Sequence, residues 1–347
     1  MKMKKLLCIA IAAIMVLALA ACGSTNTQTS ENGAPSSAPS DAASPSAENT
    51  APAEAQYVVG ICQQMTHDAL DSATQGFKDA LADILGEGAV EYSEGNAGGE
   101  QPNCVTIIDG LVSENVDLIL ANATWPLQAA YSATSEIPVL GTSVTDYATA
   151  LNIDDWTGTV GGNISGTSDL APLDQQAAMI QELFPDAKNV GLLYCSGEPN
   201  SVYQIETIRG YLEDMGYTCE AYAFTDVNDL SSVTQTACDN SDVIYIPTDN
   251  TAAGNTETIA NVVLAAGVPV VAGESGICAG CGVATLSISY YDLGYTTGEM
   301  AAQILKGEAD ISTMPIEYAP NVTKMYNAAN CEALGITVPD DYTAIEG

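Results

Sequence analysis

The sequence predicts an α/β protein with two consecutive lobes of like topology, each built on a parallel sheet with helices on both faces. Three observations support this fold class. Short apolar, β-branched runs alternate with amphipathic helical runs, an order that favours parallel strands. The second half of the chain repeats the order of the first, and nearly every predicted strand ends in polar or acidic residues that open a helix. A single long doubly wound sheet is the alternative, and it leaves the internal repeat unexplained.

Residues 1–22 are predicted to be an export signal that is not part of the fold. Lys2, Lys4 and Lys5 precede an apolar segment of about 16 residues, which is short for a membrane span. The segment ends in Leu-Ala-Ala-Cys22, which resembles the lipobox of bacterial lipoproteins, where the cysteine is lipidated and becomes the new N-terminus. We therefore expect lipidation at Cys22. An ordinary signal peptide or a transmembrane helix is the alternative.

Residues 23–55 are predicted to be a disordered tether, because they contain no Val, Ile, Leu, Phe, Tyr or Trp. Such a segment cannot bury enough apolar surface to offset the entropy of ordering it. A lipid on Cys22 followed by a flexible tether implies a domain that works just outside a membrane, on its extracytoplasmic face.

The remaining chain is strongly acidic. Its formal charge of −36 becomes −39 once the three leader lysines are removed, and Lys78, Lys188, Arg209, Lys306 and Lys324 are then the only fixed positive charges. Phosphate recognition depends on Lys and Arg, so the composition excludes nucleic acid as a partner. We interpret the acidity as a solubility feature.

The first lobe is predicted to begin at residue 56. Its elements are a strand at 56–62, helices at 67–85 and 104–114, a strand at 116–121, a helix at 124–135 and a strand at 137–143. The Gly-rich stretch at 158–166 is interpreted as a loop between the lobes.

The second lobe is predicted to follow the same order. Its elements are a strand at 189–196, a helix at 200–216, and strands at 241–246 and 267–275. The tails of the third strands are also similar, with Gly141-Thr142-Ser143 in the first lobe and Gly273-Glu274-Ser275 in the second.

Polar side chains gather at the predicted carboxyl ends of these strands. In parallel α/β sheets, ligands bind outside this edge, and helix N-termini there can hold a carboxylate without Lys or Arg. Taken singly, each of these side chains is better explained as a cap of its own helix. Six strand exits, the points where a strand ends and a helix follows, match between the two lobes, and together they nevertheless predict a ligand cleft. Its candidate contacts are Gln64, His67, Thr124, Thr142, Ser143, Asn200, Ser201, Asp249, Asn250 and Glu274.

Catalytic and metal-binding motifs are missing. His67 is the only histidine, so a Ser/His/Asp triad would need it, and the sequence has no phosphate-binding loop, HExxH motif or EF-hand spacing. We expect no enzyme activity, no cofactor and no metal. His67 is either a residue of the first helix cap or a ligand contact. Cys278 and Cys281 are the one close cysteine pair, a candidate disulfide or turn clasp; a zinc site would need two more ligands.

Several segments resemble a known family: YVVGICQQMTHDALDSATQGFKDAL, NISGTSDLAPLDQQAAMIQELFPDAKNVGLLYCSGEPNSVYQ, IYIPTDNTAAG, VPVVAGESG and LSISYYDLGYTTGEMAAQILKGEA. In this order they resemble the substrate-binding lipoproteins of ABC transporters related to tryptophan and tyrosine binders. The likeness covers residues 57–340. One departure is at the cleft mouth, where the usual His-Pro-Ala-Leu-Asp is replaced by His67-Asp68-Ala69-Leu70-Asp71.

This resemblance implies the type I periplasmic-binding protein fold, with two Rossmann-like lobes, three hinge crossovers and a closing cleft. Lobe one would comprise residues 56–160 plus about 287–312, and lobe two residues 161–286 plus about 313–347. The resemblance also implies a separate permease and ATPase as partners, and we expect the protein to be a monomer.

The resulting hypothesis is a lipid-anchored, extracytoplasmic solute-binding protein of an ABC importer that takes an amino acid, preferably an aromatic one. Thr124, Thr142 and Ser143 would hold the ligand carboxylate. Asp249, helped by Asn250 or Glu274, would hold its ammonium. Gln64, His67, Asn200 and Ser201 would frame the remainder, and Trp125 or Tyr290 could stack on the side chain. The alternatives are a nucleoside, sugar or signalling molecule in the same fold, or an extracytoplasmic enzyme or thiol redox protein.

Overall fold

The computed structural model describes residues 55–319 and 321–345. The predicted leader, Cys22 and all but the last residue of the predicted tether lie outside these described residues. Among the described helices, none has the length and apolar character needed to cross a membrane.

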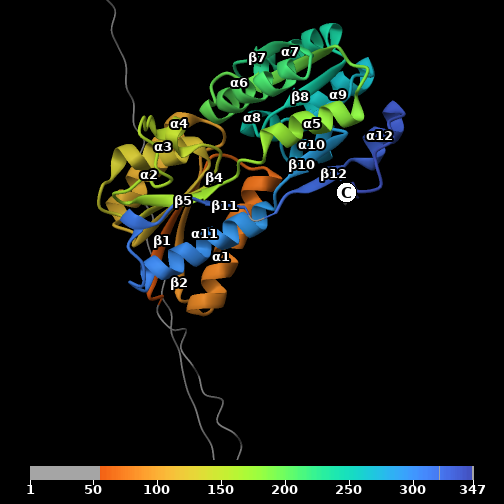
Figure 1. Ribbon diagram of the computed structural model, residues 1–347. Coiled ribbons are helices and arrows are strands. Elements are labelled where there is room, and N and C mark those ends of the chain that lie inside the picture. Colours follow the sequence, from red (N-terminus) through yellow and green to blue (C-terminus); the bar gives the residue numbers. More distant parts are fainter. Residues whose placement is uncertain (1–54, 320, 346–347) are drawn as a thin grey trace, which may run out of the picture. The chain divides into compact units, whose positions relative to one another are not determined.

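Two separate sheets form the framework, as predicted (Figure 1). The first sheet has six strands in the order β11-β5-β4-β3-β1-β2, and every neighbouring pair is parallel. Its strands are β1 (Tyr57–Gln63), β2 (Val90–Asn96), β3 (Leu118–Asn122), β4 (Val139–Val144), β5 (Ile164–Ser168) and β11 (Glu317–Tyr318).

The second sheet has seven strands in the order β13-β12-β10-β9-β8-β6-β7. All its pairs are parallel except β10 with β12, which is antiparallel. Its strands are β6 (Asn189–Cys195), β7 (Thr218–Phe224), β8 (Val243–Ile246), β9 (Val270–Ala272), β10 (Ala284–Ser287), β12 (Thr323–Tyr326) and β13 (Thr343–Ala344).

Helices cover both faces of each sheet, because apolar side chains of the central strands point to both sides. The helices of lobe one are α1 (Asp68–Leu85), α2 (Gln101–Glu114), α3 (Thr124–Ala133), α4 (Tyr147–Leu151) and α11 (Tyr290–Leu305), with the short 3-10 helix η1 (Ile311–Thr313). Those of lobe two are α5 (Leu173–Leu183), α6 (Pro199–Asp214), α7 (Val227–Asn240), α8 (Asn250–Ala253), α9 (Thr256–Ala266), α10 (Ser275–Cys281) and α12 (Ala328–Leu334).

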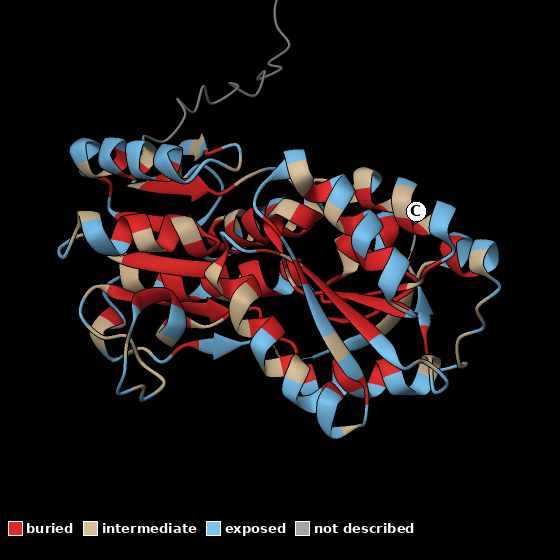
Figure 2. Cartoon of the chain, turned by 90° about the horizontal axis from the view of Figure 1, so that it is seen from above, coloured by how far each residue is buried: buried red, intermediate tan, exposed pale blue. Residues whose placement is uncertain are grey.

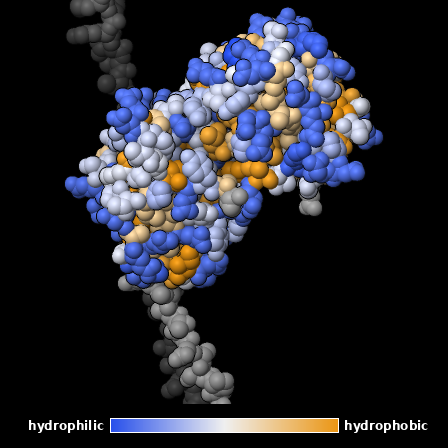
Figure 3. Space-filling model, viewed as in Figure 1, coloured by the Kyte–Doolittle hydropathy of each residue, from blue (hydrophilic) through white to orange (hydrophobic). Residues whose placement is uncertain are grey.

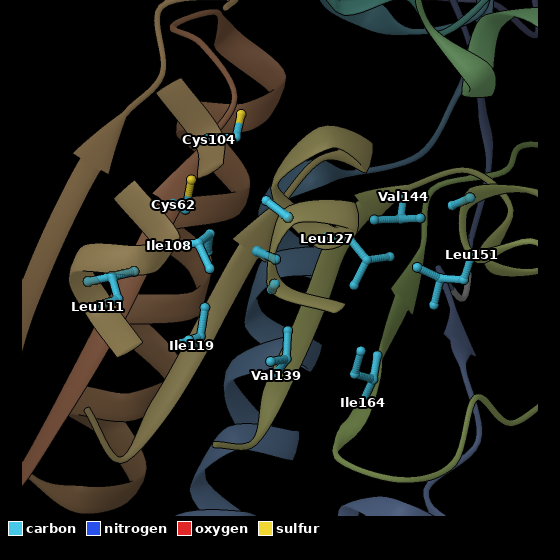
Figure 4. Packing of buried hydrophobic residues seen from close by; sticks show 14 of the residues in the cluster. Cys62, Cys104, Ile108, Leu111, Ile119, Leu127, Val139, Val144, Leu151 and Ile164 are labelled. Atoms are coloured by element: carbon cyan, nitrogen blue, oxygen red, sulfur yellow. The ribbon is translucent and has the colours of Figure 1, made fainter. Parts of the chain in front are cut away.

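Each lobe therefore has two apolar layers, one on either face of its sheet, and buried residues concentrate along the central strands (Figure 2). Figure 4 shows the layer of lobe one in which Ile108 and Leu111 of α2 and Leu127 of α3 pack against Ile119 and Val139 of the sheet. Cores of this kind in both lobes mean that each lobe can keep its shape while the two move relative to each other.

The chain passes between the sheets three times. It leaves lobe one after β5 to form α5, returns from β10 into α11, and leaves again between β11 and β12. The expected three-crossover hinge is therefore present, and the fold is of the two-lobed α/β class that the sequence predicts.

Helix α11 follows the second crossover and lies beside α1 on lobe one (Figure 1). The two helices approach very closely at Gly294, where an added Cβ would lie 1.9 Å from the backbone oxygen of Ala73. Only glycine permits this approach, so the small residue at position 294 determines how the returning helix packs.

The predicted boundary between the lobes at residues 160 and 161 needs correction. Strand β5 pairs with β4, and β11 pairs with β5, so both belong to the first sheet although the sequence-based ranges assign them to lobe two. The end of the Gly-rich stretch is thus a strand. Gly166, with a φ of 145°, lets β5 lie so close to β4 that an added Cβ would be 2.1 Å from the oxygen of Gly141.

Candidate functional site

A narrow cavity with a volume of only about 10 Å³ lies where the strand exits of the two lobes face each other. Lobe one and the crossovers contribute side chains from the start of α1, from the exits of β4 and β5, and from the start of α11. Lobe two contributes the exits of β6, β8 and β9. The lining residues are His67, Ala69, Leu70, Ser143, Thr145, Asp169, Asn200, Thr248, Asp249, Asn250, Ala253, Glu274 and Tyr290.

Seven of the residues predicted as ligand contacts line this cavity: His67, Ser143, Asn200, Asp249, Asn250, Glu274 and Tyr290. They come from six different strand exits or helix starts. The rule that ligands bind at the carboxyl edge of parallel strands accounts for their meeting.

Four predicted contacts do not line the cavity. Thr142 points into lobe one, where its hydroxyl lies 3.2 Å from that of Thr167. The Gln64 side-chain oxygen accepts a hydrogen bond from the backbone N–H of Trp125, so it caps α3 from the neighbouring strand. Thr124 and Ser201 are buried in the first turns of α3 and α6.

Trp125 also lies away from the cavity, contrary to the suggestion that it stacks on a ligand. It packs against the core of lobe one and lines a groove on the outer surface between α2 and α3, together with Val105 and Gln128. Because α3 begins at Thr124, its second residue is turned by about 100° from the first and faces α2 instead of lobe two.

Three buried carboxylates of lobe two are used to cap helices. Glu198 accepts from the backbone N–H groups of Asn250 and Thr251, at 3.1 and 2.8 Å. Asp249 accepts from the N–H of Ala252 at 2.8 Å and from that of Cys195 at 2.7 Å. The N–H groups of Asn250, Thr251 and Ala252 are in the first turn of α8 and have no intrahelical partner, so the carboxylates satisfy them. The N–H group of Cys195 is at the end of β6.

Glu274 plays the same part for α10, since its two oxygens accept from the N–H groups of Gly276 and Ile277. Burial raises the pKa of Glu274, and His67 opposes this shift by its charge. Burial, with Glu198 nearby, raises the pKa of Asp249 to about 7. The cavity wall on this side is therefore rich in acceptors whose negative charge lacks a fixed cation, because the lining contains no Lys or Arg.

Two polar atoms that line the cavity have no partner among the described residues. They are Ser143 Oγ on lobe one and Asn200 Oδ1 on lobe two, and both are buried. Ser143 has a φ of 55°, a left-handed conformation that costs a residue other than glycine energy and concentrates at functional sites. Buried polar atoms are almost always paired, so both atoms are suited to meet a bound molecule.

Asp169 is a lining residue that the sequence analysis missed. It directly follows β5, is 3% exposed, and accepts hydrogen bonds from the hydroxyls of Thr145 and Tyr290, each at 3.0 Å. Burial raises its pKa to about 6, with a smaller contribution from Glu274. A signal was available, because Asp169 is a polar residue directly after a strand, as are the residues at the other strand exits. The interpretation of 158–166 as a loop meant that this strand was not predicted.

Hydrogen bonds across the cavity join the two lobes. His67 Nε2 on lobe one lies 3.1 Å from Asn250 Oδ1 on lobe two, and the Gln204 side chain donates to Thr145 Oγ1 at 3.4 Å. These contacts and the small cavity volume describe a closed arrangement of the lobes.

Cys278 and Cys281 do not form the disulfide that was one of the alternatives. Both are free, buried thiols of α10 and pack in the core of lobe two. Burial raises the pKa of both thiols, which disfavours the reactive thiolate. Among the described side chains, no group of three His, Cys, Asp or Glu could hold a metal ion.

The visible outer face in Figure 3 is largely hydrophilic, with apolar residues in small scattered groups.

Comparisons of the sequence with known proteins point to one family. The family described as ABC transporter substrate binding protein matches residues 58–345. A tyrosine-binding protein of Clostridioides difficile is 30% identical over 281 residues, which cover 80% of this chain and 81% of that protein.

Solved structures agree with this match. A Streptococcus pneumoniae ABC domain in complex with L-Trp is 31% identical, with a TM-score of 0.79 over 84% of this chain and 100% of that one. A ligand-free, open structure of a Clostridium difficile substrate binding protein is equally identical and covers 84% of this chain and 99% of that one, but its TM-score is 0.65. At equal identity, the described arrangement is thus more similar to the ligand-bound structure than to the open one.

Proposed function

Because the chain belongs to the family of ABC transporter substrate-binding proteins, we propose that it binds an aromatic amino acid, tyrosine or tryptophan, between its lobes and delivers it to a permease. Members of this family bind solutes, and the protein is not an enzyme. The choice of ligand is supported by the names of two relatives that cover most of the chain.

The observation that carries the amino-acid proposal is the uneven distribution of charge around the cavity. The carboxylates of Asp169, Asp249 and Glu274 line it and are buried, whereas its lining has no Lys or Arg. Buried carboxylates are costly without a cation, so the cavity favours a ligand that brings a positive charge. An ammonium group satisfies this need, and a neutral sugar or nucleoside does not.

The carboxylate of the same ligand is assigned to the start of α1 and to Ser143 on lobe one. Helix α1 begins at the cavity, its N-cap His67 makes no side-chain capping bond, and Ala69 and Leu70 of its first turn line the space. The N-terminus of an 18-residue helix offers N–H donors and a partial positive charge. The unpartnered hydroxyl of Ser143 lies on the same lobe and can donate to the second oxygen.

The ligand side chain has an apolar surface available between the two ends. Ala69, Leu70 and Ala253 line the cavity, and the ring of Tyr290 does so from the hinge. An aromatic ring buried there would contribute through its apolar area, which makes Tyr290 the stacking candidate in place of Trp125.

We further propose that the protein is anchored by a lipid on Cys22 and works as a monomer with a membrane permease and a cytoplasmic ATPase. This proposal rests on the leader sequence and on the family. Labelling of the wild type, but not of Cys22→Ala, by a fatty-acid analogue in cells would support the anchor.

Isothermal titration of the purified mature chain tests the proposed function. The ligands are the twenty amino acids, with several nucleosides and sugars as controls. We expect heat of binding from L-tyrosine or L-tryptophan and none from the neutral solutes. Binding of a nucleoside or sugar, with no heat from any amino acid, would contradict the proposal.

A further inference from the structure

We propose that Asp169 is the residue that recognises the ligand's ammonium group and so selects amines over neutral analogues. This inference rests on the proposed function, because it assumes an amino acid between the lobes. It differs from the sequence-based hypothesis, in which Asp249 holds the ammonium. The buried carboxylates around the cavity differ in whether the fold already uses them to cap a helix.

Each of the three buried carboxylates of lobe two accepts hydrogen bonds from backbone N–H groups at a helix start. Asp249 binds two backbone N–H groups through different oxygens, and Glu274 does the same at the start of α10. Glu198 accepts five hydrogen bonds from the Asn250 and Thr251 backbone and from three neighbouring side chains. Capping therefore explains why these three acidic residues are present, without any ligand.

Asp169 caps no helix. The next helix, α5, begins four residues later with Pro172 as its N-cap, and that cap makes no side-chain hydrogen bond. The partners of the Asp169 carboxylate are two hydroxyls, Thr145 Oγ1 on Oδ1 and Tyr290 Oη on Oδ2. An ionised carboxylate has about four acceptor positions, so each oxygen can still accept a hydrogen bond from an ammonium.

The burial of Asp169 is unfavourable in the described structure. At 3% exposure its charge is shielded from water, and two neutral hydroxyls compensate only part of the lost hydration. Its pKa is raised to about 6, mainly by this burial and further by Glu274. A cation in the cavity would remove this penalty, because an opposite charge at close range stabilises the ionised form.

A structural role for Asp169 is the alternative. Asp169 lies on the first crossover and Tyr290 at the end of the second, so their hydrogen bond also ties two hinge segments together. Asp169→Asn separates the two roles: its amide oxygen still accepts from Tyr290 or Thr145, whereas its negative charge is gone. Asp174→Asn is a matched control, since Asp174 is an exposed acid in the first turn of α5.

The test measures the affinity of the wild type, of Asp169→Asn and of Asp174→Asn for pairs of ligands that differ only in the amino group. Isothermal titration compares L-tyrosine with 3-(4-hydroxyphenyl)propionate, which lacks the amino group, and L-tryptophan with indole-3-propionate. We expect Asp169→Asn to lose at least about 100-fold in affinity for the amino acid, because it leaves a buried ammonium unpaired. Its affinity for the analogue that lacks the amine should match that of the wild type. Asp174→Asn should bind all ligands as the wild type does.

Other outcomes overturn the assignment. Wild-type affinity of Asp169→Asn for the amino acid would show that another group holds the ammonium. An equal loss for the amino acid and for the analogue, with a lowered melting temperature, would show that Asp169 acts through the hinge.

Failure of the proposed function can be told apart from failure of this assignment by titrating tyramine, an amine without a carboxylate. If the wild type binds tyramine but neither amino acid, the proposed function is wrong. Asp169 remains the ammonium partner in that case only if Asp169→Asn fails to bind tyramine.

Discussion

At the scale of single residues, hydrogen bonds that the sequence does not show determine which buried carboxylates of the site cap a helix. Asp249 was the leading candidate for the ligand's ammonium because it follows a buried strand. The structure confirms that position but gives both of its oxygens to backbone N–H groups. Asp169 was not predicted as a site residue, because the Gly-rich stretch before it was interpreted as a loop. In the structure it is a buried carboxylate that caps no helix.

The positions of these residues could be predicted and their roles could not. The meeting of His67, Ser143 and Glu274 at one cavity follows from strand order alone. Which carboxylate is used for capping depends on contacts such as Glu198 with α8, which join residues more than fifty positions apart. No local pattern in the sequence carries that information.

The affinity for L-tyrosine or L-tryptophan should fall as the pH is lowered below about 6. Asp169, whose pKa is raised to about 6, is ionised above this value and protonated below it, and a protonated carboxyl cannot pair with an ammonium. One proton linked to binding changes affinity about tenfold per pH unit. Titrations at several pH values between 4.5 and 8 would measure this slope.

Other titrating groups face Asp169, so the profile needs controls. Glu274 and Tyr290 lie beside it, Tyr147 interacts with it through charge, and Asp249 and His67 line the same cavity. The pKa values of Tyr147 and Tyr290 are raised, so both stay neutral in this range. A His67→Gln background removes the histidine. If the slope persists unchanged in Asp169→Asn, the titrating group is not Asp169.

At the level of helices and strands, the most apolar central strands were predicted, whereas the edge strands and the internal strands β5 and β10 were not. The buried strands β1, β3, β6 and β8 are apolar runs with a clear signal. The edge strands β2 and β7 have mostly exposed or half-exposed residues, so their sequences lack such a run. Strand β12 pairs antiparallel with β10 after the third crossover, a long-range contact that periodicity cannot reveal.

The contact between α1 and α8 should slow the release of ligand. His67 Nε2 and Asn250 Oδ1 meet across the lobes, and this contact exists only when the lobes are closed. His67→Ala should therefore raise the dissociation rate severalfold, about what one hydrogen bond contributes, and leave the association rate nearly unchanged. Stopped-flow fluorescence with L-tyrosine or L-tryptophan would measure both rates.

Gln75→Ala is the control for this experiment, because Gln75 lies on the exposed face of the same helix. An unchanged dissociation rate in His67→Ala would mean that the link between α1 and α8 does not hold the closed form. A slower association rate would instead indicate that His67 helps the ligand to enter.

For the molecule as a whole, the two cores and three crossovers suggest a simple mechanical scheme. Each lobe is packed on both faces of its sheet, whereas the connections between lobes are short segments near residues 169, 288 and 319. Ligand contacts to both lobes favour the closed form over the open one by the difference in their binding free energies. The structure has a higher TM-score with the L-Trp complex than with the open relative, which supports a closed arrangement of its lobes.

A crystal structure of the mature chain with L-tyrosine or L-tryptophan, whichever binds more tightly, tests the central claim most directly. We predict that the amino acid occupies the cavity between the lobes, with its carboxylate at Ser143 and the start of α1 and its ammonium within hydrogen-bonding distance of the Asp169 carboxylate. A ligand bound outside this cavity, or an ammonium held by Asp249 with Asp169 unengaged, would contradict the account.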